Sequence, residues 1–215
     1  MRSHKGLFIT FEGTAEGLGK TTQALLLAEE LTNQGYEVVL TRNPGGTALG
    51  EQIRSMLLHP GNTEMSKATE LMLYMADRAQ NYKEVIKPAL RNGKIVICDR
   101  FIDSTLVYQG AGRGWKTAFL WRLHHATTGS LIPNLTVVLH GSPHIDRSKH
   151  SPDRIEREGT LFFDKVRDAM LHLTTKDSRY SLVSAVNKDA REVHQDIMAV
   201  IQERKLLALV KKKPS

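Results

Sequence analysis

The chain has 215 residues, of which 40% are hydrophobic and 25% charged, and its formal net charge is +7. This ordinary globular composition argues against a disordered, collagen-like or disulfide-stapled chain, and we expect one domain over residues 1–215. No run approaches the ~18 consecutive apolar residues that a membrane helix needs. The N-terminus shows no signal peptide and the single cysteine, Cys98, fits a reducing compartment, so we expect a cytoplasmic protein.

The positive charge is concentrated near the C-terminus. Residues 203–215 hold five basic residues against one acid, which accounts for +4 of the +7. A frayed and solvated basic tail explains this distribution better than an arm that binds nucleic acid. We therefore predict a basic C-terminal tail over 203–215, and neither a nucleic-acid partner nor a membrane partner.

Strand-like and helix-like segments alternate along the chain. The predicted strands cover residues 7–11, 36–41, 94–98, 135–139 and 180–183. Helical spacing predicts helices over 20–33, around 53–57, from an N-cap at Ser66 to 81, around 85–90, over 115–127, up to about 173, and over 190–210. This alternation predicts an α/β fold, in which a parallel sheet is flanked by helices and ligands lie beyond the carboxyl ends of the strands. The segments of interest are therefore 12–22, 42–54, 99–114 and 140–158.

A glycine-rich segment separates the first predicted strand from the first predicted helix, and it reads Gly13-Thr14-Ala15-Glu16-Gly17-Leu18-Gly19-Lys20-Thr21. Backbone N–H groups of such a loop cradle phosphates, a lysine reaches the β- and γ-phosphates, and a threonine hydroxyl ligates Mg²⁺. The standard spacing G-x-x-x-x-G-K-T needs glycine where Thr14 stands, so the loop is one residue longer. Because the second half keeps its spacing, we predict that ATP is bound by Gly17, Leu18, Gly19, Lys20, Thr21 and Thr22, and that the extra residue bulges at Thr14 and Ala15.

An apolar strand ends in a carboxylate at Ile95-Val96-Ile97-Cys98-Asp99. Many buried strands end in aspartate, so this feature is weak evidence when it stands alone. Beside a phosphate-binding loop, it predicts that Asp99 and Thr21 hold Mg²⁺.

Six motifs occur in order along the chain. They are Phe11-Glu12-Gly13 with Gly19-Lys20-Thr21-Thr22, Thr41-Arg42-Asn43-Pro44-Gly45-Gly46-Thr47, Ala76-Asp77-Arg78, Cys98-Asp99-Arg100-Phe101-Ile102-Asp103-Ser104, Tyr108-Gln109-Gly110-Ala111-Gly112-Arg113-Gly114 and Asp153-Arg154-Ile155-Glu156. In these motifs the chain resembles the bacterial-type thymidylate kinases over nearly its whole length. The resemblance implies a three-layer P-loop NTPase fold with a short lid at 141–158. It also implies a homodimer that transfers the γ-phosphoryl group of ATP to dTMP with Mg²⁺, giving dTDP and ADP.

The resemblance also implies roles for single residues. Arg100 and Arg54 would hold the acceptor phosphate, and a planar guanidinium suits a phosphate dianion. Tyr74 would stack on thymine, and Arg78, one helical turn later, would reach a base carbonyl. The remaining acceptor residues are Thr105 and Gln109 at the base edge, Tyr108 near the sugar and Glu16 at the 3′-hydroxyl. Lid arginines would stabilise the transferring group, with Arg154 the better match and Arg147 the weaker one.

The chain departs from the family pattern at five places. Besides the longer phosphate loop, Asn43, His140 and Ser184 stand where the family has carboxylates, and the lid is roughly one helical turn shorter. These departures leave two alternatives open. One is a degenerate nucleotide-binding protein with little activity, and the other is a kinase for a different nucleoside monophosphate.

Overall fold

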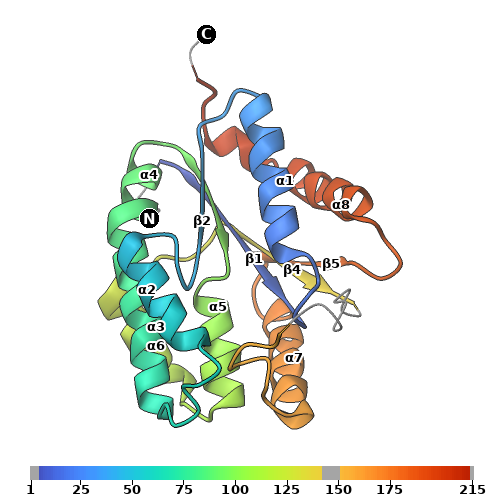
Figure 1. The fold of residues 1–215 in the computed structure, drawn as a ribbon. Helices are drawn as coiled ribbons and strands as arrows, with labels where there is room; N and C mark the ends of the chain where they lie inside the picture. The colour runs from blue at the N-terminus through green and yellow to red at the C-terminus, as the bar shows by residue number, and fades with distance from the viewer. Residues whose placement is uncertain (1–4, 142–150, 214–215) are drawn as a thin grey trace.

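The computed structural model describes residues 5–141 and 151–213 (Figure 1). A five-stranded parallel sheet has the order β2-β3-β1-β4-β5. Its strands are β1 (Leu7–Gly13), β2 (Val38–Arg42), β3 (Ile95–Asp99), β4 (Leu135–His140) and β5 (Tyr180–Ser184). The predicted strands are confirmed with shifts of one or two residues at their ends. Within the described residues, no helix is long and apolar enough to cross a membrane.

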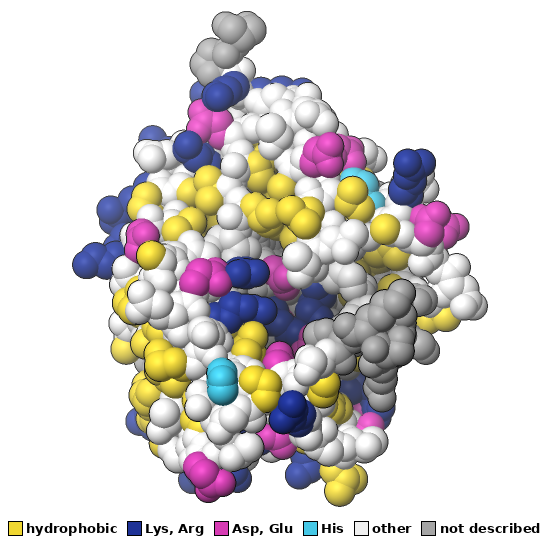
Figure 2. All heavy atoms as spheres, in the orientation of Figure 1, with side chains coloured by type: hydrophobic (Ala, Val, Ile, Leu, Met, Phe, Trp, Pro, Cys, Tyr) yellow, Lys and Arg dark blue, Asp and Glu magenta, His cyan; other side chains and the backbone are white. Residues whose placement is uncertain are grey.

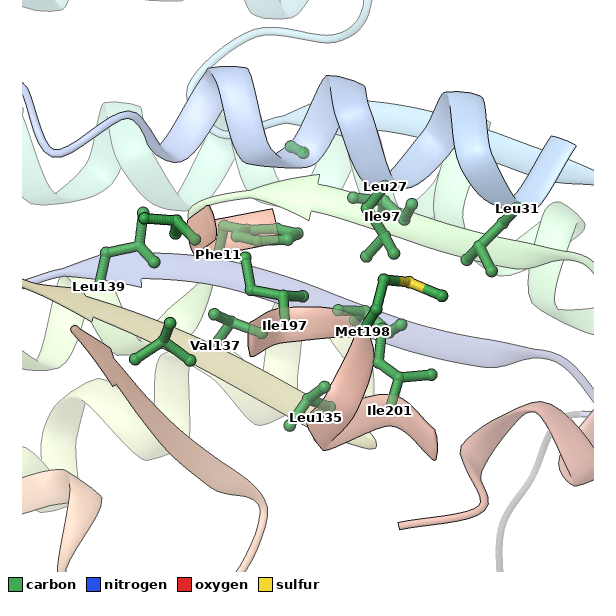
Figure 3. Close-up of a cluster of buried hydrophobic side chains, with 14 of the residues drawn as sticks. Phe11, Leu27, Leu31, Ile97, Leu135, Val137, Leu139, Ile197, Met198 and Ile201 are labelled. Atoms are coloured by element: carbon green, nitrogen blue, oxygen red, sulfur yellow. The ribbon is translucent and has the colours of Figure 1, made fainter. Parts of the chain in front are cut away.

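Two helices cover one face of the sheet, α1 (Lys20–Asn33) and α8 (Ala190–Glu203). Their apolar stripes meet alternate side chains of the strands, and Figure 3 shows Leu27 of α1 and Ile197 of α8 directed toward Phe11 and Ile97. All four side chains are fully buried, and each such side chain contributes about 1.5–3 kcal/mol by leaving water. This packing fixes the start of α1 against the end of β1, where the phosphate loop lies.

The other face of the sheet carries the helices that lie between β2 and β5 in the chain. They are α3 (Lys67–Asn81), η1 (Tyr82–Ile86), α4 (Lys87–Arg91), α5 (Ile102–Thr105), η2 (Leu106–Gly112), α6 (Thr117–Thr128) and α7 (Thr160–Thr174), with α2 (Ala48–Leu58) packed on α3. Phe8, Val96 and Cys98 point into this second core. The predicted three-layer α/β fold is confirmed.

Two of the predicted helices near residue 81 are one continuous helix. The chain passes from α3 through the π-helical turn η1 into α4, and Asn81 and Tyr82 keep helical angles. Asparagine favours helix ends because its side chain competes for backbone partners. Here the Asn81 amide instead donates to Thr41 Oγ1 at 2.8 Å and to the Gly45 carbonyl at 2.9 Å, which leaves the helix free to continue.

The last predicted helix is shorter than expected. It ends at Glu203, Lys205 adopts a left-handed conformation with φ +50°, and a 3₁₀ turn η3 (Leu206–Leu209) follows. Leu206 is buried, and Val210 packs against the same core as α8. The Lys213 N–H donates to the Gly35 carbonyl at 2.9 Å. Residues 206–210 are therefore packed on the domain, and the expectation of a frayed tail was wrong for them. Residues 211–213 are exposed, as expected of a solvated basic tail.

Candidate active site

A cleft of about 770 Å³ opens at the carboxyl ends of the strands. Figure 2 shows Lys, Arg, Asp and Glu side chains gathered in this hollow. Apart from Arg154, the predicted site residues within the described part of the chain line it: Glu16, Gly17, Leu18, Gly19, Lys20, Thr21, Thr22, Arg54, Tyr74, Arg78, Asp99, Arg100, Thr105, Tyr108 and Gln109. Residues from four separate segments of the sequence thus meet in one place.

The phosphate loop takes up its extra residue on the strand side. The Thr14 N–H donates to the Leu139 carbonyl at 2.9 Å, which extends the β1–β4 pairing by one step. Ala15 packs partly against the core, and its carbonyl accepts from Lys20 Nζ at 3.2 Å. Gly19 precedes α1 at φ +82°, an angle that side chains rarely adopt. The first N–H groups of α1, which lack acceptors within the helix, therefore keep their position at the cleft.

Glu16 joins the loop to the opposite wall of the cleft. Its carboxylate lies 2.5 Å from Arg100 Nη2 and 3.4 Å from Lys20 Nζ, and it accepts from the Tyr108 hydroxyl at 2.5 Å. Burial opposes the charge on Glu16, but Arg100 and Lys20 outweigh it and hold the pKa of the carboxyl well below its usual range. Burial and Arg100 lower the pKa of Lys20. Two cations from different elements therefore share one anion at the centre of the cleft.

Arg100 is held in an unusual backbone conformation. Its φ is +67°, which costs a non-glycine residue roughly 1–3 kcal/mol and persists only where the surroundings enforce it. The Arg100 N–H donates to the Phe11 carbonyl at 2.9 Å. The buried carboxylate of Glu12 accepts from the N–H groups of Phe101 at 2.8 Å and Ser104 at 3.2 Å, and from the Ser104 hydroxyl at 2.5 Å. Glu12 thus fixes the turn that aims Arg100 into the cleft.

The environment of Glu12 also changes its acidity. Burial and the neighbouring Asp103 raise the pKa of Glu12 to about 7, although Arg100 and the hydrogen bonds from Ser104 and Phe101 act against the rise. Sequence reasoning assigned no role to Glu12 beyond its place in a motif. Its position at the end of an apolar strand, one residue before the loop, is the signal that could have marked it.

Oxygen ligands lie together on the donor side. The Thr21 hydroxyl donates to Asp99 Oδ2 at 2.5 Å, and Asp99 Oδ1 is buried without a hydrogen-bond partner. Within the described residues, no cluster of three or more His, Cys, Asp or Glu side chains could hold a metal ion. Mg²⁺ does not require such a cluster, because it keeps several waters and takes one or two protein oxygens together with substrate phosphates.

The other end of the cleft is lined by polar groups that lack partners. Arg78 is 1% exposed, its Nη2 donates to the Phe101 carbonyl at 3.0 Å, and its Nε has no partner. The buried Thr105 hydroxyl also has none. Burying a polar group without a hydrogen bond is costly. Such atoms beside a cleft therefore indicate that a ligand completes their hydrogen bonds.

Arg54 and Tyr74 stand at the same end of the cleft. Arg54 Nη1 donates to the Pro44 carbonyl at 2.9 Å, so the turn after β2 positions it. Burial, together with neighbouring Arg42, lowers the pKa of Arg54. Burial raises the pKa of Tyr74, so its hydroxyl stays neutral and its ring offers a flat uncharged surface to the cleft.

The lid arginines were predicted to reach the transferring phosphoryl group. Arg154 does not line the cleft in this structure. Its Nε donates to the Leu57 carbonyl at 2.8 Å and its Nη1 lies 2.8 Å from Glu70 Oε2, while Nη2 has no partner. The buried carboxylate of Glu70 holds this side chain, and its catalytic role stays a prediction. Arg147 lies outside the described residues.

Two departures from the family pattern have visible consequences. Asn43 is buried, and its amide donates to Asp77 Oδ2 at 2.9 Å, while Asp77 Oδ1 accepts from the Gly45 N–H at 2.7 Å. Asn43 therefore braces the turn after β2. Burial raises the pKa of Asp77 to about 6. Ser184 ends β5, and its hydroxyl accepts from the Val186 N–H at 3.3 Å.

The donor end contains residues that sequence reasoning missed. Gln23, Ala185, Lys188, Asp189, Ala190 and Val193 complete the lining of the cleft there. Gln23 Nε2 donates to the Ala190 carbonyl at 2.8 Å, which ties α1 to the start of α8. The segment after β5 follows the rule that ligands lie beyond the carboxyl ends of the strands in a parallel sheet. Applying that rule to β5 would have found all of these residues except Gln23, which lies in the first turn of α1.

The site combines a phosphate loop between β1 and α1 with an aspartate at the end of β3, beside the Thr21 hydroxyl. It also holds two cations at the centre of the cleft. This combination is that of a P-loop phosphotransferase. Comparisons with known proteins specify the family. The family model described as thymidylate kinase matches residues 11–197. The chain belongs to the thymidylate kinase family.

Individual relatives agree with this assignment. A thymidylate kinase from Pseudomonas fluorescens (strain SBW25) is 48% identical over 201 residues, which cover 91% of this chain and 95% of the relative. A thymidylate kinase from Symbiobacterium thermophilum is 42% identical over 200 residues, covering 92% and 93%. A solved thymidylate kinase from Ehrlichia chaffeensis superposes with a TM-score of 0.72 at 34% identity, covering 92% of this chain and 98% of that one. The predicted family and fold are both confirmed.

Proposed function

We propose that this chain transfers the γ-phosphoryl group of ATP to dTMP, giving dTDP and ADP, with Mg²⁺ as cofactor. The observation that carries the proposal is the pair of cations, Lys20 and Arg100, that share the Glu16 carboxylate between the phosphate loop and the pocket at Arg78. Phosphoryl transfer depends mainly on charge neutralisation and in-line positioning. A centre that brings two anionic phosphates together from opposite sides supplies both.

The donor side would bind ATP. The backbone of Gly17, Leu18 and Gly19 and the first N–H groups of α1 would cradle its phosphates, with Lys20 on the β- and γ-phosphates. Thr21 Oγ1 and Asp99 Oδ1 fit Mg²⁺, since one is a hydroxyl oxygen and the other a buried carboxylate oxygen without a partner. Bound there, Mg²⁺ would neutralise charge on the phosphates.

The acceptor phosphate would replace the Glu16 carboxylate as the partner of Arg100. Arg100 is paired with Glu16 in this structure, and a phosphate dianion offers the same guanidinium more acceptors and more charge. Glu16 would then turn toward the 3′-hydroxyl of the acceptor, while Arg54 would hold the phosphate from the other side. Tyr108, whose hydroxyl donates to Glu16, would lie near the sugar and disfavour a 2′-hydroxyl.

The base would fill the end of the cleft at Arg78. Its carbonyl oxygen would accept from the Arg78 Nε that now lacks a partner, and the Thr105 hydroxyl would gain one as well. Tyr74 would stack on the ring, and Gln109 would face the base edge. This set fits a pyrimidine with carbonyl groups better than a purine.

The lid at 141–158 would exclude water and supply charge through Arg154 and Arg147. We also propose that the protein acts in the cytoplasm as a homodimer, as its resemblance implied. These assignments rest on the family pattern and on the residues quoted for it. They are separate from the chemistry of the cleft.

One assay tests the proposal. ADP release is measured in a coupled assay with ATP, Mg²⁺ and either dTMP, dUMP, dGMP or AMP as acceptor. We expect dTMP to give the highest kcat/KM and the purines to give almost no turnover. Equal turnover of a purine monophosphate would support a kinase for another acceptor. Failure of dTMP to stimulate ADP release, with ATP still bound, would support the degenerate nucleotide-binding protein.

A further inference from the structure

Glu70 lies at a junction of the acceptor side that no motif singled out. It belongs to α3, one helical turn before Tyr74, and it is 1% exposed. Its Oε1 accepts from Gln109 Nε2 at 3.1 Å and from Arg113 Nε at 3.1 Å. Its Oε2 accepts from Arg113 Nη2 at 3.0 Å and from Arg154 Nη1 at 2.8 Å. The carboxylate thus accepts hydrogen bonds from Gln109 in η2, from Arg113 at the end of η2 and from Arg154 in the segment before α7.

These contacts keep Glu70 ionised. Burial opposes its charge, but the hydrogen bonds from Arg113 and Gln109 and the charge of Arg113 outweigh burial and lower the pKa of Glu70. An ionised carboxylate has no proton to donate and can only accept hydrogen bonds. Every group that touches Glu70 must therefore present a donor.

This requirement decides the orientation of Gln109. A glutamine amide has one donating end and one accepting end, and the two are nearly the same shape. Because Glu70 accepts only, Gln109 must turn its NH₂ group toward Glu70. Its carbonyl oxygen is then left for other partners, and the side chain lines the cleft at the base end. The reverse orientation would place two acceptors in contact in a buried site, which is costly.

We propose that Glu70 is a positioning residue that sets base selectivity through Gln109. With its carbonyl oxygen free, Gln109 accepts a hydrogen bond from a ring N–H at the base edge. Thymine and uracil carry such a proton at N3, whereas cytosine presents an acceptor there. The inference rests on the proposed function, because it assumes that the base of a nucleoside monophosphate lies in this end of the cleft.

The two arginines give Glu70 a second role that must be separated from the first. Arg113 also lies 2.6 Å from Glu158 Oε1, so the network braces the end of η2 against the segment before α7. Removing one partner of a buried ion pair is strongly destabilising, because the other charge is left buried and unpaired. Loss of stability on changing Glu70 would therefore say nothing about Gln109, and the test needs a readout that follows the amide alone.

A double-mutant cycle supplies that readout. Glu70→Gln, Gln109→Leu and the double variant are compared with the unchanged chain, and KM and kcat are measured for dTMP, dCMP and ATP. Glu70→Gln lets the Gln109 amide turn over, so we expect KM for dTMP to rise by about tenfold, the value of one hydrogen bond. The preference for dTMP over dCMP should shrink, and KM for ATP should stay unchanged. In the Gln109→Leu background, Glu70→Gln should add nothing further to KM for dTMP.

A matched control isolates the ion pairs. Arg113→Gln removes the positive charge that pairs with Glu70 but leaves the contact between Glu70 and Gln109. It should therefore lower Tm, while KM for dTMP stays within about twofold of the unchanged chain. If Glu70→Gln does not fold, N3-methyl-dTMP tests the orientation in the unchanged chain. We expect this analogue to be rejected by about 100-fold relative to dTMP, because it has no N3 proton, and Gln109→Leu should narrow the gap.

Two results would overturn the inference. One is an equal effect of Glu70→Gln on KM for dTMP in both backgrounds, which would mean that Glu70 acts without Gln109. The other is acceptance of N3-methyl-dTMP as readily as dTMP. Both are measured against dTMP turnover by the unchanged chain. Absence of that turnover would instead contradict the proposed function itself.

Discussion

The two ends of the cleft are built in different ways. The phosphate loop at the donor end is mostly backbone from one continuous stretch, in which the residues from Gly13 to Gly19 lead directly into α1. The acceptor end is mostly side chains, contributed by α2, α3, α5 and η2. A backbone site needs only the correct loop and its glycines. A side-chain site needs a scaffold that holds each group in place, and the difference predicts where substitutions are tolerated.

Buried acids provide that scaffold at the acceptor end. Glu12 holds the turn after β3, Glu70 holds Gln109 and two arginines, and Asp77 holds the turn after β2. All three are at most 1% exposed. Each accepts hydrogen bonds from groups far away in sequence. Acceptor geometry should therefore depend on residues that never touch the substrate, whereas donor geometry should not.

The largest expected effect is at the donor end, where one side chain carries much of the charge. Lys20→Ala should reduce kcat by on the order of 100- to 1000-fold, because it removes a fixed cation from the transferring phosphates. Steady-state kinetics with dTMP measure the loss. Lys94→Ala is the matched control, because its pair with Glu37 lies on the exposed surface and such pairs contribute little. Near-normal kcat for Lys20→Ala would show that the donor phosphates lie elsewhere.

Arg100 allows chemistry and strain to be separated at the acceptor end. Arg100→Ala and Arg100→Gly should each lower kcat/KM for dTMP by about 100-fold, since both remove the guanidinium. At φ +67° the backbone of glycine is unstrained, whereas that of alanine is strained. The free energy of unfolding of Arg100→Gly should therefore be about 1 kcal/mol higher than that of Arg100→Ala. Urea unfolding measures that gap. Equal stability of the two variants would mean that the turn relaxes once the side chain is lost.

The same contrast explains what could be predicted from the sequence. The phosphate loop, Asp99 and the five strands were found because each is a local pattern: glycines at fixed spacing, or an apolar run that ends in a polar residue. The acceptor residues Tyr74, Arg78 and Gln109 were assigned only through the family resemblance. Nothing in their own spacing shows that α3 and η2 line the same cleft.

The errors have physical causes of the same kind. No helix was predicted for residues 102–112, but α5 and η2 form there, and Glu12 and Glu70 supply hydrogen bonds that hold them. An acid in a sequence is normally solvated, so the role of Glu70 could not be seen in advance. For Glu12, its place at the end of a fully buried strand was the one available signal. Lys205, at φ +50°, ends α8 without a glycine or proline to mark the position. Tertiary contacts outweighed the local signals in each case.

Glu12 should make stability depend on pH. Its pKa rises from 4.5 to about 7 on folding, so between these values the folded chain keeps a proton that the unfolded chain has lost. The free energy of unfolding should therefore fall as pH rises through this window, by up to about 3 kcal/mol, and stay low above it. Glu12→Gln removes the titration. The free energy of unfolding is measured with urea for both chains at about pH 5 and about pH 8. It should fall more for the unchanged chain than for Glu12→Gln, and an equal fall in both would contradict the assignment.

The smallest effect is expected from the extra residue of the phosphate loop. Thr14 is bonded to Leu139, and Ala15 packs against the core with its carbonyl on Lys20, so the insertion lies on the strand side and away from the first turn of α1. Deleting Ala15 should leave the Kd for ATP unchanged or raise it by a few-fold, because Lys20 loses an acceptor that positions it. Titration with ATP and Mg²⁺ measures the change. A displacement of ~1 Å within the cradle itself can cost about 100-fold. A large gain in ATP affinity on deletion would therefore mean that the insertion obstructs the phosphates, and would favour the degenerate nucleotide-binding protein over an active kinase.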